Sequence, residues 1–156
     1  MKNDTLIVIP IRMGSSRFPG KPLIDINGKA MIAHVWHKAM SSNCGDVIVA
    51  CCDKEASDYL RKYNIPFIMT KKKLNSGTDR VYNAIENLKK KTFYKYIINL
   101  QGDIPNISPQ SIKKLALIIK QKSVRMATLA SKIKDPKAIK DKNIVKVALT
   151  KHFKFY

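Results

Sequence analysis

Three cationic side chains lie in the loop that follows the first apolar run of the sequence. This loop, residues 10–23, carries Arg12, Arg17 and Lys21. An opposite charge about 4 Å from one of these cations interacts with it by roughly 4 kcal/mol at an effective dielectric of about 20. If the three cations of the loop converge, they are suited to hold a triphosphate.

Small residues in the same loop add backbone donors for an anion. Gly14, Ser15 and Ser16 can turn their N–H groups toward a phosphate. The loop differs from a Walker A motif, because five residues separate Gly14 from Gly20 and Pro22 follows the lysine. The chain also contains no GxGxxG fingerprint of dinucleotide sites. A basic surface loop without a ligand is the alternative interpretation.

A second candidate site residue, Asp103, follows an apolar segment in the middle of the chain. It ends the sequence Asn-Leu-Gln-Gly-Asp of residues 99–103. An acidic residue just beyond a strand, after a glycine that lets the backbone turn, is suited to hold a phosphate-bound Mg²⁺. Acidic residues are scarce in this chain, at 11 against 30 basic ones, which makes this carboxylate more informative. The alternative is simple Asp-x-Pro turn chemistry.

Residues 76–80 have the pattern of a helix start. Ser76 followed by Asp79 resembles a capping box, and a capped helix N-terminus also offers N–H groups to a ligand. His34 and His37 are spaced i, i+3 in an expected helix, with no third metal ligand nearby in sequence. We therefore interpret both histidines as packing or surface residues.

Apolar runs and helical spacings alternate along the chain and predict the elements that position these residues. Continuous β-branched runs indicate strands buried on both faces, and apolar residues three or four apart indicate helices. The predicted strands cover residues 5–11, 46–52, 66–70, 94–100, 124–130 and 144–150. The predicted helices cover residues 29–40, 54–63, 76–91 and 109–120. The alternation predicts an α/β fold with a mostly parallel, helix-covered sheet, which binds ligands beyond the carboxyl ends of its strands.

Length and composition are those of one globular domain. The chain has 156 residues, of which 45% are hydrophobic, and this is enough for a packed core. Its net charge of +19 comes from 25 lysines and 5 arginines against 11 acids. Arginine, the residue suited to bidentate phosphate and base contacts, is rare. A compositional drift toward lysine explains the charge, and a surface for a polyanion is the alternative.

The cysteines indicate a reduced compartment. Cys44, Cys51 and Cys52 have no metal-ligand spacing, and we interpret them as small strand hydrophobes of a cytoplasmic protein. No signal-peptide core and no run of about eighteen apolar residues is present, so we expect no membrane contact. Residues 151–156 have the pattern of a strand with no helix after it, so we expect the chain to end within a larger architecture.

Six short segments form one recognisable pattern. The most specific contains Arg-Phe-Pro-Gly-Lys-Pro-Leu at residues 17–23. The others are residues 10–12, 26–29, 31–35, 76–80 and 99–103. In order and spacing they resemble the 3-deoxy-manno-octulosonate cytidylyltransferases, the CMP-Kdo synthetases of Gram-negative bacteria. CMP-sialate synthetases share the fold and the early arginine but lack the specific string, which makes them the weaker match.

This resemblance implies a Rossmann-like nucleotidyltransferase fold and a reaction for lipopolysaccharide synthesis. CTP and Kdo (3-deoxy-D-manno-octulosonate) give CMP-Kdo and pyrophosphate with Mg²⁺, as the anomeric hydroxyl attacks the α-phosphorus in line. Arg12, Lys21 and Asp103 are the implied catalytic residues, and Asp103 is also the implied Mg²⁺ ligand. The implied substrate-binding residues are Arg12, Gly14, Ser15, Arg17, Lys21, Ser76, Gly77, Thr78, Arg80 and Gln101. Among them, residues 76–80 border the cytosine and Gln101 faces the nucleotide or the sugar.

The chain departs from the family pattern in two ways. Ile104 stands where the family usually has a glutamate after the aspartate, and family members continue past the position of Tyr156. The resemblance places a second metal-binding aspartate, most Kdo contacts and the dimer interface in that later part. We therefore expect residues 1–156 to be a nucleotide-binding α/β domain, the N-terminal part of a longer homodimeric enzyme. Alone, this chain is expected to have little or no activity.

The alternative from another class is a small basic RNA-binding protein without catalysis. It predicts salt-dependent binding to any RNA. The enzyme hypothesis predicts CTP-specific, Mg²⁺-dependent protection against unfolding that is lost in Lys21→Ala. We adopt the enzyme hypothesis, with CTP and Kdo as partners and with neither nucleic acid nor a membrane.

Overall fold

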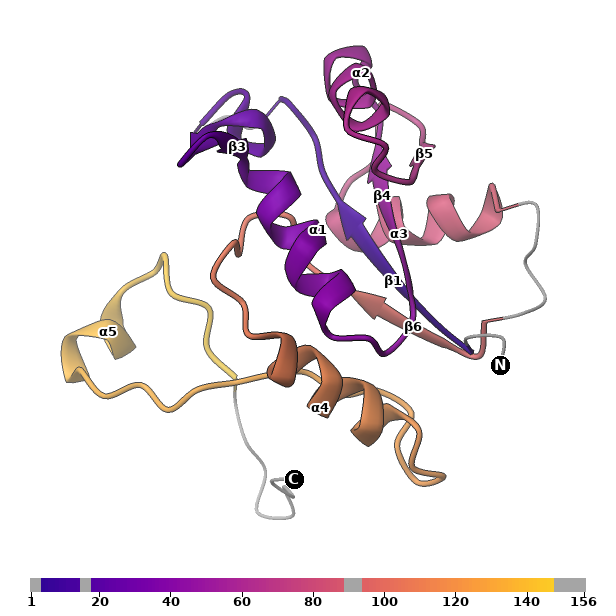
Figure 1. The fold of residues 1–156 in the computed structure, drawn as a ribbon. Coiled ribbons are helices and arrows are strands. Elements are labelled where there is room, and N and C mark those ends of the chain that lie inside the picture. The colour runs from indigo at the N-terminus through magenta and orange to yellow at the C-terminus, as the bar shows by residue number, and fades with distance from the viewer. Residues whose placement is uncertain (1–3, 15–17, 89–93, 148–156) are drawn as a thin grey trace.

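The structure is a computed structural model that describes residues 4–14, 18–88 and 94–147 (Figure 1). Its centre is a four-stranded sheet of order β5-β4-β1-β6, in which every neighbouring pair is parallel. The strands are β1 (Thr5–Pro10), β4 (Asp46–Cys51), β5 (Phe67–Met69) and β6 (Tyr96–Asn99). The main helices are α1 (Met31–Ser41), α2 (Lys54–Lys62), α3 (Gly77–Glu86) and α4 (Pro109–Ile119). The predicted parallel α/β sheet is confirmed.

Strand β1 forms the middle of the core because its side chains are apolar on both faces. Ile7 and Ile9 pack with residues of α1, α2 and α4 on one face. Leu6 and Val8 pack with residues of α3 on the other face. Helices therefore cover both faces of the sheet (Figure 1). This two-sided burial is why the strand reads as a continuous apolar run rather than an alternating one.

Three short elements lie between β1 and α1. A 3₁₀ turn, η1 (Lys21–Leu23), is followed by an antiparallel hairpin of β2 (Asp25–Ile26) and β3 (Lys29–Ala30). Asn27 and Gly28 form the hairpin turn with φ values of 51° and 82°, as Asn-Gly turns require. The predicted helix over 29–40 starts two residues later than expected because Lys29 and Ala30 pair with β2.

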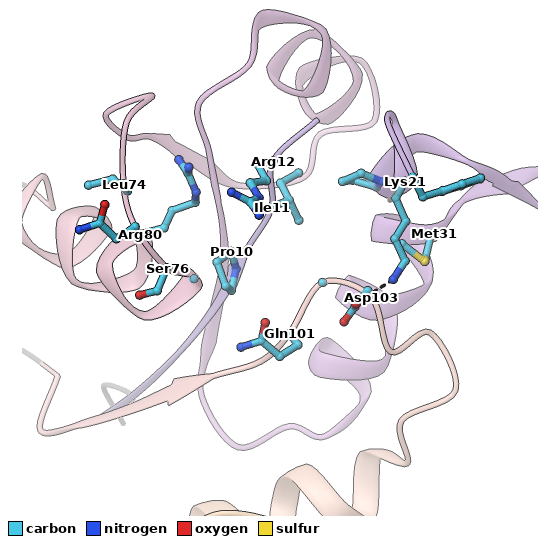
Figure 2. A pocket seen from close by; sticks show the side chains of 15 residues that line it. Pro10, Ile11, Arg12, Lys21, Met31, Leu74, Ser76, Arg80, Gln101 and Asp103 are labelled. Atoms are coloured by element: carbon cyan, nitrogen blue, oxygen red, sulfur yellow. Dashed lines mark hydrogen bonds and ion pairs between the residues drawn. The ribbon is translucent and has the colours of Figure 1, made fainter. Parts of the chain in front are cut away.

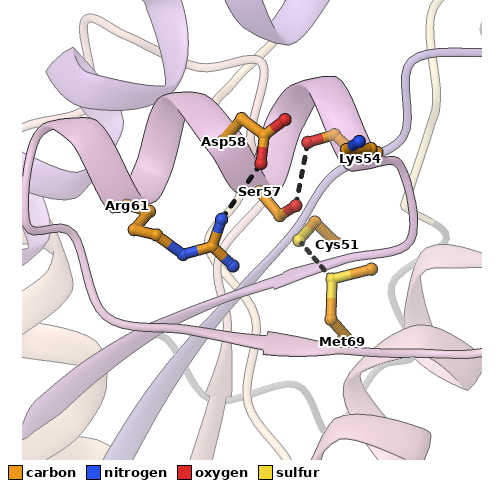
Figure 3. A network of polar contacts seen from close by, with 6 residues as sticks. All are labelled: Cys51, Lys54, Ser57, Asp58, Arg61 and Met69. Atoms are coloured by element: carbon orange, nitrogen blue, oxygen red, sulfur yellow. Dashed lines mark hydrogen bonds and ion pairs between the residues drawn. The ribbon is translucent and has the colours of Figure 1, made fainter.

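Helix α2 packs over the strands β4 and β5 through small and apolar residues (Figure 3). Ser57 donates from Oγ to the carbonyl of Lys54 at 2.8 Å, which satisfies this buried hydroxyl within the helix. In the strands beneath it, Cys51 Sγ lies 3.6 Å from Met69 Sδ. Burial raises the pKa of the Cys51 thiol to about 11. The interpretation of Cys51 and Cys52 as buried hydrophobes is confirmed.

The segment after α4 differs from its sequence prediction. Residues 124–130 form no strand, and Met126 is 89% exposed. The strand predicted over 144–150 is also absent from its described part, residues 144–147. Its remaining part and the expected strand at 151–156 lie outside the described residues. The helix predicted over 76–91 is shorter than expected, because it ends at Glu86 and Asn87 caps it, and residues 89–91 lie outside the described residues. β-Branched residues form a strand only where a sheet edge and a packing face receive them.

One short helix interrupts this last segment. Helix α5 (Pro136–Lys140) begins at Asp135, whose side chain accepts a hydrogen bond from the N–H of Lys137. No residue of α5 is buried, so this helix gains little stability from packing against the core. Throughout the described ranges, every helix is too short or too polar to traverse a lipid bilayer.

Candidate active site

A pocket of about 560 Å³ opens beyond the carboxyl ends of β1 and β6 (Figure 2). This volume lies within the range of small-molecule sites, about 300–1,000 Å³. The predicted site residues that line it are Arg12, Lys21, Ser76, Gly77, Arg80, Gln101 and Asp103. Gly14 and Thr78 do not line the pocket, whereas Ser15 and Arg17 lie outside the described residues. Seven of the predicted site residues thus line one pocket, at the edge of the sheet where the sequence predicts a ligand site.

Lys21 and Asp103 both line the pocket and contact each other directly. Lys21 Nζ donates to Asp103 Oδ2 at 2.7 Å, and the two residues are separated by 82 positions in sequence. Gly20 places the lysine by adopting φ +74°, and its N–H donates to the carbonyl of Met13 at 3.0 Å. Pro22 is buried and anchors the turn that follows. The loop from β1 and the turn after β6 are thus held close together.

Gly102 allows the turn after β6 to approach β1. A Cβ atom at this position would lie 2.6 Å from Ile11 Cγ2 and 3.1 Å from the carbonyl oxygen of Pro10. Only glycine fits this approach without displacing the backbone. The glycine therefore sets the positions of its two neighbours in the pocket, Gln101 and Asp103.

Asp53 supports the basic loop and was not singled out by sequence reasoning. Its Oδ2 accepts the N–H of Met13 at 2.9 Å and the thiol of Cys52 at 3.3 Å. Burial raises the pKa of the Cys52 thiol, and the hydrogen bond to the carboxylate raises it further. The available sequence signal was position, because Asp53 follows β4 as Asp103 follows β6. Asp53 orients the backbone next to Arg12.

Arg80 forms part of the opposite side of the pocket and is only 3% exposed. Its guanidinium donates from Nη1 to Thr70 Oγ1 at 2.5 Å and to the carbonyl of Lys71 at 3.2 Å. One turn later in α3, Asn83 Oδ1 accepts the N–H of Lys71 at 3.0 Å. Both side chains hold the start of the loop that leads to Ser76. This structural role of Arg80 was not foreseen.

Ser76 caps α3 as the sequence predicts. Its Oγ accepts the N–H of Asp79 at 3.1 Å and donates to Asp79 Oδ2 at 2.9 Å. Asn99 links helix α3 to Gln101, which lies in the floor of the pocket formed by the turn after β6. Its Nδ2 donates to Thr78 Oγ1 at 3.4 Å, and its Oδ1 accepts from Gln101 Nε2 at 3.2 Å. Thr78 does not line the pocket; it contacts Gln101 only through Asn99.

His34 and His37 belong to no metal cluster within the described ranges. His34 Nε2 contacts the carbonyl of Ile26 at 2.8 Å, and His37 packs edge-on against Trp36, with ring centroids 5.0 Å apart. Partial burial lowers the pKa of His37. His34 is half-buried and His37 is exposed, which agrees with the interpretation of both as packing or surface residues.

The electrostatics of the pocket favour an anionic ligand. Its lining contains the cations Arg12, Lys21 and Arg80 against one carboxylate, Asp103. A single exposed carboxylate fits a magnesium ion that takes its remaining ligands from phosphates and water, as Mg²⁺ usually does. It does not fit a metal held by protein groups alone, since no cluster of three candidate ligands occurs in the described part of the chain.

Similar proteins are cytidylyltransferases. Curated 3-deoxy-manno-octulosonate cytidylyltransferases from Wigglesworthia glossinidia brevipalpis and Paramagnetospirillum magneticum are 43% and 37% identical to this chain. The alignments cover 94% and 92% of this chain, but 60% and 58% of those proteins. The chain thus spans about three fifths of the length of these curated relatives.

Solved structures agree with this family. A CMP:2-keto-3-deoxy-manno-octonic acid synthetase complexed with CTP superposes with a TM-score of 0.69 at 38% identity. The superposition covers 74% of this chain and 47% of that one. A nucleotidyl transferase from Methanothermobacter thermautotroptrophicus, at 17% identity and a TM-score of 0.60, shares the fold. The cytidylyltransferase family profile matches residues 6–155, and the chain therefore belongs to the cytidylyltransferase family.

Proposed function

We propose that the protein to which this chain belongs transfers the cytidylyl group of CTP to Kdo, giving CMP-Kdo and pyrophosphate. The observation that carries this proposal is the meeting of Lys21 and Asp103 in a pocket with an excess of cations. The names of the curated relatives support Kdo rather than sialate as the sugar. CMP-Kdo would then serve lipopolysaccharide synthesis.

In the proposed reaction, the anomeric hydroxyl of Kdo attacks the α-phosphorus of CTP and loses its proton, while pyrophosphate leaves. Arg12 and Lys21 neutralise the triphosphate and the charge that develops on the leaving group. Arg17, from the same loop, is proposed to assist them. Asp103 would hold Mg²⁺, which supplies further neutralisation of phosphate charge when bound.

The remaining pocket residues are proposed to position the nucleotide. Ser76 and Gly77 begin α3, where the helix N-terminus offers N–H groups to a ligand. The wall that contains them and Arg80 is proposed to border the cytosine. Gln101 projects from the floor (Figure 2) and is proposed to face the nucleotide or the sugar. The loop residues Gly14 and Ser15 would add backbone donors for phosphate.

We further propose a cytoplasmic location and a homodimer for the complete protein. Both proposals rest on the family rather than on contacts of this chain. A nucleic-acid role is the competing hypothesis, since the net charge of +19 suits a polyanion. Lys21 and Arg12 are aimed at one pocket, and this favours a compact anionic ligand over a long polymer (Figure 2).

Thermal unfolding of the chain with CTP and Mg²⁺ tests this function. At about 100 times its Kd, a ligand adds about 2.7 kcal/mol of stability, which raises the Tm of a domain of this size by roughly 5–10 °C. We expect this shift with CTP, a smaller one with ATP, and a clearly reduced one with CTP in Lys21→Ala.

Lys120→Ala is the matched control for that experiment. Lys120 pairs with Asp4 at 2.6 Å and has the same side-chain exposure as Lys21, 38%. Because Asp4 precedes the amino end of β1, this ion pair lies away from the pocket. The control should keep the full CTP shift. If CTP leaves the Tm of the folded wild type unchanged while RNA binds with steep salt dependence, the RNA-binding hypothesis replaces this proposal.

A further inference from the structure

The ion pair between Lys21 and Asp103 joins two groups for which different ligands are proposed. Lys21 is the proposed phosphate cation, and Asp103 is the proposed magnesium ligand. In the structure the ammonium and the carboxylate are 2.7 Å apart (Figure 2), so each neutralises the other. While this contact persists, the charge that each group offers to its proposed ligand is partly neutralised, so each should bind that ligand more weakly.

The backbone makes this contact a built feature rather than a chance surface pair. The Gly20 turn and the buried Pro22 fix the base of Lys21. Gly102 packs against Ile11 and fixes the base of Asp103. The four-carbon stem of a lysine is flexible enough to carry its charge elsewhere without a change in these backbone contacts.

The strength of the contact suits exchange. The side chains of Lys21 and Asp103 are 38% and 51% exposed. Ion pairs with this exposure are weak because water and salt screen them. A divalent cation that carries phosphate ligands competes well for the same carboxylate oxygen.

We propose that the Lys21 ammonium occupies the cation position of Asp103 until a metal ion displaces it toward the nucleotide phosphates. This inference rests on the proposed function, because it assigns both ligands to the same pocket. Its consequence is positive coupling: the metal frees Lys21 for the phosphates, and the phosphates retain Lys21 away from Asp103. Metal alone and nucleotide alone should each bind more weakly than the two together.

Binding of Mn²⁺ alone, followed by electron paramagnetic resonance, tests the competition without any turnover. Lys21→Met should bind Mn²⁺ roughly two- to fivefold more tightly than the wild type, the range expected from loss of one exposed ion pair. Asp103→Asn should lose this Mn²⁺ site. Lys21→Gln provides a second variant if the methionine variant does not fold.

Arg12→Met is the control for simple charge repulsion. Arg12 lines the same pocket and carries the same charge, but in the described residues it forms no ion pair with Asp103. Its removal should tighten Mn²⁺ binding much less than Lys21→Met does. If the two variants tighten Mn²⁺ binding equally, general repulsion explains the result and the competition is wrong.

The outcomes separate this inference from the proposed function. If Asp103→Asn removes Mn²⁺ binding but Lys21→Met leaves it at the wild-type value, the competition fails while the metal role of Asp103 stands. If none of the folded proteins binds Mn²⁺ alone, the tightening expected from Lys21→Met is absent and the inference fails. The metal role of Asp103 fails, and the inference with it, if Asp103→Asn leaves Mn²⁺ binding unchanged or if Mn²⁺ supplied with CTP binds equally to the wild type and to Asp103→Asn.

Metal-free CTP binding provides the second readout. In EDTA, Asp103→Asn should tighten CTP binding in the wild-type background, because it releases Lys21 for the phosphates. The same substitution should have a clearly smaller effect in the Lys21→Met background. Equal tightening in both backgrounds would reflect repulsion between the carboxylate and the phosphates, and it would overturn the inference.

Discussion

Two sides of one pocket each carry a cation, and the two cations have opposite environments (Figure 2). Arg80 is 3% exposed and donates to the neutral oxygens of Thr70 and Lys71. Lys21 has a side chain that is 38% exposed and contacts the carboxylate of Asp103. The positive charge of Arg80 thus stabilises the loop before α3, whereas we infer that the positive charge of Lys21 can exchange partners and bind a ligand.

The difference teaches that charge alone does not identify a binding residue. A buried cation needs fixed hydrogen-bond partners, and Arg80 has them on the loop before α3. An exposed cation that shares only a screened ion pair can change partners at low cost. Substitutions should therefore affect stability on the Arg80 side and ligand binding on the Lys21 side.

Arg80→Ala should have the largest effect, because it removes two buried hydrogen bonds and leaves a cavity. We expect the free energy of unfolding to fall by about 2–4 kcal/mol, measured by urea denaturation. Arg61→Ala is the control, since Arg61 forms an exposed pair with Asp58 (Figure 3) and should change stability by less than about 1 kcal/mol. If Arg80→Ala and Arg61→Ala both lower the free energy of unfolding by less than about 1 kcal/mol, Arg80 does not stabilise the fold more than an exposed arginine does.

Gly102→Ala tests the close approach between the turn after β6 and strand β1, which forms the floor of the pocket between Arg80 and Lys21. The added Cβ would lie 2.6 Å from Ile11 Cγ2, so we expect a loss of about 1–3 kcal/mol in the free energy of unfolding. CTP binding should weaken as well, because Gln101 and Asp103 shift. Gly14→Ala is the matched control for the stability measurement alone, as its Cβ meets no described atom within 4 Å. Wild-type stability of Gly102→Ala would contradict the close approach.

Lys21→Met should sharpen the comparison by separating binding from stability. We expect CTP affinity to fall at least about tenfold, because a charge-assisted contact to phosphate is lost. The free energy of unfolding should change by less than about 1 kcal/mol. Titration calorimetry and urea denaturation of the same sample provide the two values, with Lys120→Met as control. A large loss of stability without a loss of affinity would reverse the assignment.

Asp53→Ala should have the smallest effect of the four substitutions. It tests whether Asp53 supports the basic loop that carries Lys21. Loss of the acceptor for the Met13 N–H lets the basic loop relax, and we expect CTP to bind about threefold more weakly. Asp53→Asn retains an acceptor oxygen and should recover most of the affinity. Identical affinities for the alanine variant and the wild type would show that the loop needs no such anchor.

The centre of the fold follows from local patterns because strand β1 is buried along its whole length and packs on both faces. The run from Leu6 to Ile9 has no polar interruption, and only a central parallel strand provides such an environment. Residues 124–130 are also mostly apolar, but Arg125 and Thr128 interrupt them, and they form no strand. The pattern specifies what would be buried, whereas the presence of a neighbouring sheet edge is a property of the tertiary structure.

The site was predictable where a motif coincided with a strand end. Lys21 and Asp103 were identified in this way, and the structure brings them into contact. The roles of Asp53 and Arg80 were not predictable, because their partners are set by tertiary approach. Asp53 and Met13, for example, are 40 residues apart, and no local pattern links them.

A crystal structure of the chain with CTP and Mg²⁺ tests the central claim most directly. The account predicts the triphosphate in the pocket beyond β1 and β6, with Lys21 turned from Asp103 to a phosphate oxygen and the metal at the vacated carboxylate. A nucleotide bound elsewhere, or one bound here with metal while the contact between Lys21 and Asp103 stays intact, would contradict it.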